Sequence, residues 1–217
     1  MKYVLMDLDG TITNPKLGIT KSVQYALRAK NIEVEDLDSL CKFIGPPLVD
    51  SFMEFYGFTE QEADEAVEKY REYYTDKGIF ENEVYPGMED LLDNLKQAGI
   101  VVIVATSKPE VFARQILEHF LIDGYFDDIC GATMDRSRTT KEEVIRYALL
   151  KNGITDLPST VMVGDRKFDI EGAKKVGISS MGVLFGFGSR EELEKAGSDR
   201  IAETVEEIYD IVINFKK

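Results

Sequence analysis

Residues 3–11 read Tyr3-Val4-Leu5-Met6-Asp7-Leu8-Asp9-Gly10-Thr11, and this stretch decides the fold. Four residues that suit a buried strand come first, and polar residues follow them at once. Residues i and i+2 of an extended chain face the same side, so Asp7 and Asp9 can address one ligand. Gly10 then allows the backbone to turn away tightly. The stretch predicts a buried strand with two carboxylates at its carboxyl end.

Two further apolar runs have the same form, residues 100–104 and 160–163, and each ends in a polar cluster. Residues 180–184 have the pattern of a further strand, and residues 129–132 have a weaker one. Helical spacing separates or follows these runs at residues 88–98, 110–120, 142–151, 170–176 and 203–215. Alternating strands and helices predict an α/β fold with a doubly wound, parallel, Rossmann-like sheet and helices on both faces.

Residues 15–83 have a different pattern. Helical spacing appears at residues 22–30, 49–56 and 60–77, with no convincing strand between them. We therefore expect two domains: a core of residues 1–14 and 84–217, and an inserted all-helical domain of residues 15–83. The acidic stretch at residues 60–68 is interpreted as a solvated helix face, since runs of charge usually are.

Composition restricts the partners. The 217 residues are 44% hydrophobic and 30% charged, as in ordinary globular proteins. The net charge of −14 would repel polyphosphate backbones, so no nucleic-acid partner is expected. No apolar run approaches the roughly 20 residues that span a bilayer. Cys41 and Cys130 form no CxxC pattern, which suits a reducing compartment. We expect a cytoplasmic protein without a membrane partner.

Ligands of open α/β sheets gather beyond the carboxyl ends of the strands. The polar residues expected there are Asp7, Asp9, Thr106, Ser107, Lys141, Asp165 and Asp169. Phosphoryl transfer needs a nucleophile, a proton carrier and positive charge around the phosphate oxygens. Asp7 is the candidate nucleophile, which would form an aspartyl-phosphate. Asp9 would protonate the leaving oxygen and later deprotonate water. Mg²⁺ prefers oxygen ligands, and Asp7 with Asp165 are the natural pair.

Each of these residues also has a purely structural interpretation. Asp165 could be a helix cap, Lys141 a solvated lysine, and Asp169 a surface acid or a group that orients Lys167 or a metal-bound water. Thr106 and Ser107 could begin a helix, with Ser107 in a capping box. Such a helix start would also suit an anion. His119 is interpreted as structural. Gly186-Phe187-Gly188 lacks the context of a dinucleotide fingerprint, and no Walker A loop occurs.

Together, Asp7-Leu8-Asp9-Gly10-Thr11, Thr106, Lys141 and Gly164-Asp165 through Asp169 resemble the four ordered motifs of the haloacid dehalogenase-like hydrolase superfamily. The helical insert is similar to that family's cap, and the chain looks like the phosphoglycolate phosphatase-type branch. The resemblance implies that Thr106, Ser107 and Lys141 bind phosphate. It also implies that Asp7, the Asp9 backbone carbonyl and Asp165 hold Mg²⁺, with Asp169 supporting the metal shell.

Some positions refine or limit this resemblance. The family's dehalogenases lack the second acid of the first motif and its transporting ATPases carry Thr there, so Asp9 favours a phosphatase. Gly45 and Pro46 resemble the cap loop that helps choose substrates, although an ordinary Gly-Pro turn also fits. In the family, the lysine of the third motif is commonly found in a Lys-Pro context. In this chain Arg138 lies three residues before Lys141 and could share its role. The family often has an Asp a few residues after the Asp9-Gly10-Thr11 of the first motif, and this chain has Thr13-Asn14 there instead.

These observations predict a Mg²⁺-dependent phosphatase that hydrolyses a small phosphorylated metabolite through an aspartyl-phosphate, similar to phosphoglycolate phosphatases. A 5′-nucleotidase, an inorganic pyrophosphatase and a phosphosugar mutase remain alternatives on the same scaffold. A catalytically silent, acidic interaction module is the alternative from another class. We expect a monomer or a weak dimer.

Overall fold

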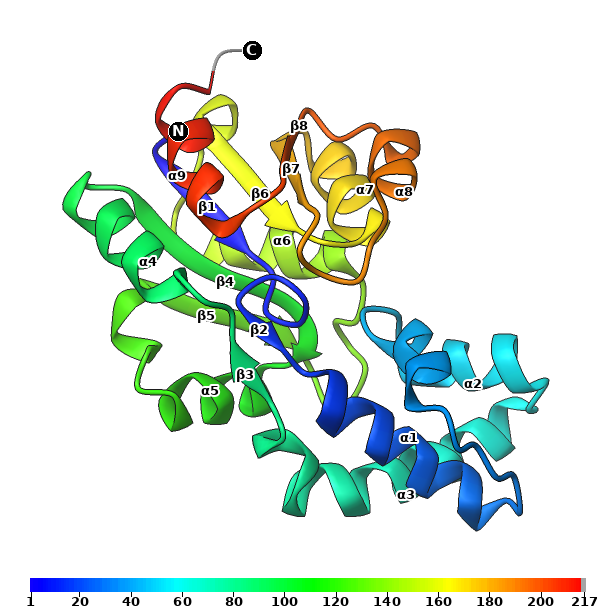
Figure 1. Ribbon diagram of the computed structural model, residues 1–217. Coiled ribbons are helices and arrows are strands. Elements are labelled where there is room, and N and C mark those ends of the chain that lie inside the picture. Colours follow the sequence, from blue (N-terminus) through cyan, green and yellow to red (C-terminus); the bar gives the residue numbers. More distant parts are fainter. Residues whose placement is uncertain (216–217) are drawn as a thin grey trace. The chain divides into compact units, whose positions relative to one another are not determined.

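The computed structural model describes residues 1–215 (Figure 1). The chain forms two compact units. One comprises Met1–Asn14 and the chain from Val84 onward, and the other comprises Pro15–Glu83. Two short strands, β2 (Thr13–Asn14) and β3 (Glu83–Val84), pair with each other where the chain passes between the units. Two-residue strands carry too little apolar pattern to be found in the sequence.

The larger unit contains a six-stranded sheet in which every described pairing is parallel. Its strands lie in the order β5 (Asp128–Ala132), β4 (Val101–Pro109), β1 (Tyr3–Met6), β6 (Thr160–Gly164), β7 (Ser179–Val183) and β8 (Arg200–Ala202). The chain winds outward from β1 through β4 and β5, then crosses to β6 on the other side of β1. This reversal next to β1 confirms the doubly wound α/β class and is where such sheets bind ligands.

Helices cover both faces of this sheet (Figure 1). They are α4 (Met88–Gln97), α5 (Glu110–His119), α6 (Lys141–Lys151), α7 (Lys167–Val176), α8 (Arg190–Ala196) and α9 (Val205–Ile213). The side chains of Leu5, Ile103 and Met162 belong to one buried cluster with residues of α6 and α7. Because side chains alternate along a strand, the intervening residues face the opposite side, where α4 packs against α9.

The strand β4 differs most from its prediction, because it continues past residue 104 to Pro109. The predicted capping box at Ser107 is therefore wrong: Ser107 lies inside β4, and the residue that precedes α5 is Pro109, which makes no side-chain cap. The short strand β8 was missed, since only its last residue is fully buried. Most other boundaries shift by up to three residues, as at α7, which begins at Lys167 rather than at residue 170. The largest shift is at α1 (Lys16–Ala29), which begins at Lys16 rather than at residue 22.

The smaller unit is helical and contains α1 (Lys16–Ala29), α2 (Leu48–Tyr56) and α3 (Glu60–Asp76). A 3₁₀ turn at Leu37–Phe43 lies between α1 and α2, and another at Gly78–Phe80 follows α3. Its own apolar residues fill its interior: Val23, Leu27, Phe52, Val67, Tyr70 and Tyr74 are buried, and Phe55 is half-buried. A capping box between Thr59 and Glu62 begins α3, and the acids Glu60, Glu65 and Glu68 are exposed, as the charge run predicted.

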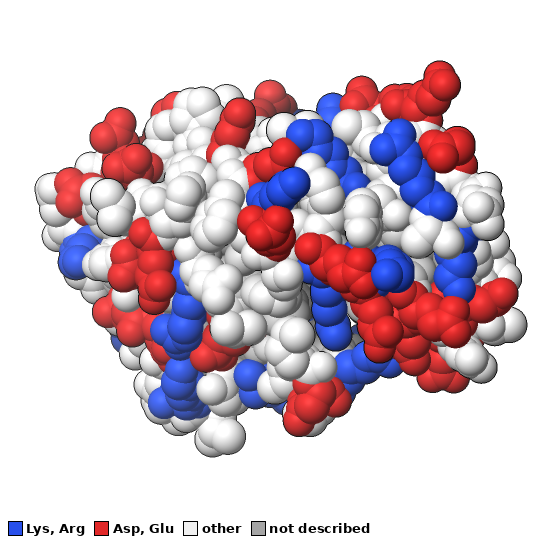
Figure 2. Space-filling view, turned by 90° about the horizontal axis from the view of Figure 1, so that it is seen from below, with Lys and Arg blue, Asp and Glu red and all other residues white. Residues whose placement is uncertain are grey.

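Charged side chains of both signs are interspersed on the face drawn in Figure 2, where acidic groups separate most of the Lys and Arg side chains. Within residues 1–215, no helix combines the length and the apolar character that crossing a membrane requires. Both cysteines are free thiols: Cys130 is buried in the core, whereas Cys41 is half-buried.

Candidate active site

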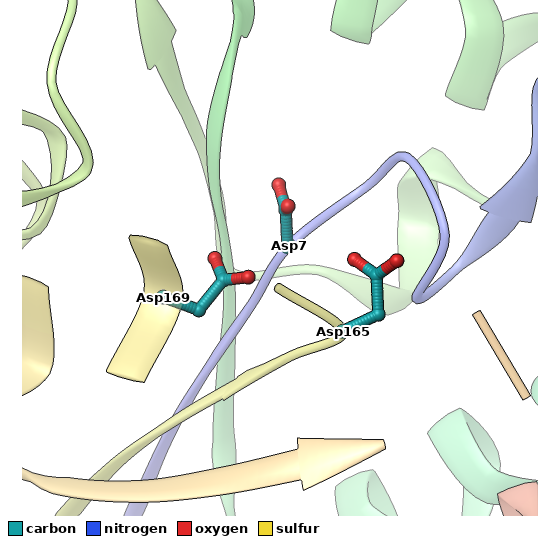
Figure 3. Close-up of side chains that lie close together, drawn as sticks. All are labelled: Asp7, Asp165 and Asp169. Carbon is teal, nitrogen blue, oxygen red and sulfur yellow. The ribbon is translucent and has the colours of Figure 1, made fainter. Parts of the chain in front are cut away.

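Three carboxylates from distant parts of the sequence meet at the carboxyl end of the sheet (Figure 3). Asp7 follows β1, Asp165 follows β6, and Asp169 lies in the first turn of α7. One ligand oxygen from each lies within 4.8 Å of the others. The register explains the convergence, because Met6 pairs with Val163 and the Asp7 N–H donates to the Val163 carbonyl at 2.9 Å. The predicted proximity of Asp7 and Asp165 is therefore present.

Asp7 is buried and firmly held. Its Oδ1 accepts hydrogen bonds from the Leu8 N–H at 2.8 Å and from Lys141 Nζ at 2.7 Å. The same ammonium group contacts Asp169 Oδ1 at 2.9 Å and the Ala105 carbonyl at 3.0 Å. Burial by itself would lower the pKa of Lys141, but the carboxylates of Asp169 and Asp7 outweigh it and raise the pKa. Lys141 is thus a buried cation, and its interpretation as a solvated lysine is wrong.

Asp165 is fully buried and is not the cap of α7, since Arg166 holds that position. Its Oδ2 accepts a hydrogen bond from the Phe187 N–H at 2.7 Å, while Oδ1 has no partner among the described residues. Burial, reinforced by the carboxylates of Asp169 and Asp7, raises the pKa of Asp165 well above its ordinary value. Gly10, at φ +85°, passes so close that a Cβ there would lie 2.2 Å from Asp165 Oδ2.

Asp169 is not a surface acid, because only 1% of it is exposed. Its Oδ2 accepts a hydrogen bond from the Arg166 N–H at 3.1 Å, and its ammonium partner is Lys141 rather than Lys167. Burial raises the pKa of Asp169, although the Lys141 charge opposes the shift.

These three acids fit a divalent cation. A buried carboxylate oxygen without a partner, as at Asp165 Oδ1, calls for a positive group beside it. Carboxylate oxygens are the ligands that hard divalent cations such as Mg²⁺ prefer. Lys141 supplies one positive charge to the group of three carboxylates, so their charge is only partly compensated. Asp169 also lies close enough to be a ligand itself, beyond the supporting position predicted for it.

Asp9 and the end of β4 form the other half of the site. Asp9 Oδ2 pairs with Lys108 Nζ at 2.9 Å, and burial raises the pKa of Asp9 although Lys108 opposes the shift. The buried Thr106 hydroxyl accepts a hydrogen bond from the Lys108 N–H at 3.1 Å, and the half-buried Ser107 lies between them. Lys108 was not predicted as a site residue. The available signal was its place directly after Thr106-Ser107 at a strand end.

Two other predicted candidates remain, Arg138 and the Gly45-Pro46 turn. Arg138 donates from Nε to the Gly131 carbonyl at 2.8 Å, and its guanidinium lies over the Tyr147 ring at 3.6 Å, so its partners differ from those of Lys141. Gly45 and Pro46 belong to the smaller unit, where Gly45 has φ +106° and the chain turns into α2. The substrate-selecting role of this loop remains a prediction.

A glycine loop after β7 (Ser179–Val183), formed by Gly186, Phe187 and Gly188, packs closely against Asp165. This contact was not predicted. A Cβ at Gly186 would lie 2.4 Å from Asp165 Cβ, and one at Gly188 would lie 1.8 Å from the Asp165 carbonyl oxygen. Between them, Phe187 supplies the N–H bound by Asp165 Oδ2. Only glycines permit this approach, so the loop orients a candidate metal ligand from outside.

We therefore expect Gly188→Ala to displace Asp165 and to weaken Mg²⁺ binding by about 10- to 100-fold, as loss of a group that orients a ligand usually does. A Mg²⁺ titration followed by thermal denaturation measures this directly. Gly124→Ala is the matched control, because a Cβ at Gly124 meets nothing within 4 Å. Equal Mg²⁺ affinity in the two variants would contradict the role of the loop.

The site combines an acid at a buried strand end, a second acid two residues later, a buried lysine and three clustered carboxylates. These are groups that suit phosphoryl transfer. The profile of the haloacid dehalogenase-like hydrolases matches residues 4–183. A 5′-nucleotidase of Pseudomonas aeruginosa is 48% identical over 88% of this chain and 86% of its own length. The tyrosine-protein kinase PtkA of Mycobacterium tuberculosis is 37% identical over 95% of this chain and 71% of its own.

Among solved structures, a predicted phosphatase from Clostridium acetobutylicum superimposes with a TM-score of 0.94 at 51% identity, covering 98% of both chains. The chain belongs to the haloacid dehalogenase-like hydrolases. It is an enzyme of the phosphatase class, which hydrolyses phosphoric monoesters. The resemblance drawn from the motifs is thereby confirmed.

Proposed function

We propose that this enzyme is a Mg²⁺-dependent phosphatase that hydrolyses 5′-nucleotides or similarly small phosphomonoesters through an aspartyl-phosphate on Asp7. The observation that carries the proposal is the setting of Asp7: Lys141 lies at 2.7 Å, and Asp165 and Asp169 complete a group that suits a cation. Asp7, the Asp9 backbone carbonyl and Asp165 would hold Mg²⁺. When bound, Mg²⁺ would neutralise the phosphate oxygens as phosphorus is attacked.

The side chains divide the chemistry between them. Asp7 is the nucleophile, and the Leu8 N–H and Lys141 hold its carboxylate in place through Oδ1. Thr106 Oγ1 already accepts a hydrogen bond from the Lys108 N–H, so its own hydrogen is directed to a phosphate oxygen. Ser107 adds a donor for the phosphate. The three N–H groups of Lys141 are engaged by Asp7, Asp169 and the Ala105 carbonyl, so Lys141 contributes positive charge beside the phosphate.

Asp9 moves the protons. It gives its proton to the leaving oxygen as that oxygen separates from phosphorus, and Asp7 becomes phosphorylated. The ionised Asp9 then takes a proton from water, the water oxygen attacks phosphorus, and phosphate leaves while Asp7 and the protonated Asp9 are regenerated. Burial raises the pKa of Asp9, which is the direction that favours a proton donor.

The 5′-nucleotide is preferred as substrate because the 48% identical relative is a 5′-nucleotidase. A phosphoglycolate phosphatase-like activity, which the motifs favour, is the second candidate. We also propose that residues 15–83 act as the cap, with Gly45 and Pro46 in its substrate loop, in a cytoplasmic monomer or weak dimer.

The test is phosphate release from 5′-nucleoside monophosphates, 2-phosphoglycolate, pyrophosphate and sugar phosphates, each with Mg²⁺ and with EDTA. We expect the highest kcat/KM with a nucleotide, loss of activity in EDTA, and recovery when Mg²⁺ is returned. Activity that survives thorough chelation would contradict the metal assignment. Transfer of the ATP γ-phosphate to a tyrosine peptide, without phosphate release from any ester, would instead place the enzyme with PtkA.

A further inference from the structure

A buried ion pair joins Lys108 to the candidate proton carrier. Lys108 Nζ lies 2.9 Å from Asp9 Oδ2, and the two side chains are only 5% and 13% exposed. Asp9 Oδ1 is buried and has no hydrogen-bond partner among the described residues. The two oxygens of this carboxyl group therefore differ: Lys108 fixes one, and the other is left for a ligand.

An irregularity in β4 brings Lys108 to this place. Thr106 pairs with Gly131, and the next pairing joins Pro109 to Ala132, so Ser107 and Lys108 are extra residues in β4. Bulges of this kind redirect side chains, and they are common next to active sites. The hydrogen bond from the Lys108 N–H to Thr106 Oγ1 stabilises the irregular segment. One local distortion thus serves both the phosphate-binding threonine and the partner of Asp9.

We propose that Lys108 is a positioning residue that holds the Asp9 carboxyl group so that Oδ1, the unpartnered oxygen, exchanges the proton with the leaving group and then with water. The inference rests on the proposed function and adds a residue to its machinery. Without Lys108, the carboxyl group would rotate about its side-chain bonds, and fewer molecules would present Oδ1 to the leaving oxygen. The resulting fall in kcat/KM would be largest for substrates whose leaving group needs a proton.

Two aryl phosphates of nearly equal size provide the probe. Phenolate is a poor leaving group, because the pKa of phenol is about 10. By contrast, p-nitrophenolate leaves readily without a proton. We expect Lys108→Met to lower kcat/KM for phenyl phosphate by about tenfold or more, and to change kcat/KM for p-nitrophenyl phosphate much less. Lys108→Arg, which keeps the charge, should recover most of the loss.

The ratio of the two kcat/KM values on one preparation does not depend on the fraction of folded enzyme, so partial unfolding cannot imitate this result. Lys2→Met is the matched control, because Lys2 forms an exposed ion pair with Asp156 and precedes β1, away from the strand's carboxyl end. In an Asp9→Asn background, Lys108→Met should cause no further loss for phenyl phosphate.

Three results would overturn the inference. If the ratio of kcat/KM for phenyl phosphate to kcat/KM for p-nitrophenyl phosphate were the same in Lys108→Met and in the wild type, the positioning role would be excluded. The proposed function would remain intact. Additive losses from Lys108→Met and Asp9→Asn would show that Lys108 acts on something other than Asp9. Wild-type enzyme that releases phosphate in Mg²⁺ neither from these two esters nor from any 5′-nucleotide or other small phosphomonoester would contradict the proposed function, and the inference would fail with it.

Discussion

Replacing Asp7 with asparagine is expected to lower kcat by about 10⁴-fold or more, because loss of a nucleophile removes the covalent route. The fold should persist. An amide has nearly the same size as the carboxylate, and its oxygen can still accept hydrogen bonds from the Leu8 N–H and from Lys141. Phosphate release from the best nucleotide substrate measures the loss, and thermal denaturation measures the stability.

The matched control for this variant is Asp93→Asn, which makes the same chemical change at an exposed position on α4. Its activity and melting temperature should equal those of the wild type. A phosphorylated carboxyl group should also be trapped in the wild-type enzyme by acid quenching, and it should be absent from Asp7→Asn. Substantial turnover by Asp7→Asn would refute the assignment of the nucleophile.

The second large effect is expected from Lys141→Met, which removes the ammonium group between Asp7 and Asp169. Breaking a buried ion pair by removing one partner costs about 3–5 kcal/mol, because the remaining charge stays buried without compensation. We expect a loss of unfolding free energy on this scale in EDTA, measured by urea denaturation, together with a severe loss of activity. Mg²⁺ should restore part of the stability, since it supplies positive charge to the same carboxylates.

An exposed ion pair provides the comparison for Lys141. Lys69 pairs with Glu72 on the surface of α3, where both side chains are about half exposed. Exposed pairs contribute little to stability, so Lys69→Met should leave the urea midpoint unchanged. A Lys141→Met protein that unfolds at the wild-type urea concentration in EDTA would contradict the buried-cation interpretation.

The strands and their polar ends were predictable because buried parallel strands leave continuous apolar runs in the sequence. Residues 3–6 and 160–163 show this, and their carboxyl ends were expected to carry Asp7 and Asp165. The end of β4 was not predictable. Its last residues, Thr106 to Pro109, are polar or break the pattern, and they are held by pairing with β5 and by side-chain contacts.

Single-residue interpretations failed where a side chain's environment comes from distant segments. A lysine that begins a helix is usually solvated, and Lys141 is buried only because Asp7 and Asp169 surround its ammonium group. Asp169 has the spacing of a surface acid, yet it lies against the sheet end. Gly186 and Gly188 belong to no recognisable sequence motif. They are needed because a Cβ at either position would collide with Asp165, a contact that the local sequence does not reveal.

The sequence by itself determined the α/β class, the helical insert and the identity of the acids at the strand ends, since local apolar periodicity and chain order encode these features. Only the tertiary structure decided which of those groups touch. It placed Lys141 between two carboxylates, joined Lys108 to Asp9 and closed the glycine loop on Asp165. The physical reason is that ion pairing and desolvation depend on distances between segments far apart in the chain, and the local pattern does not record these distances.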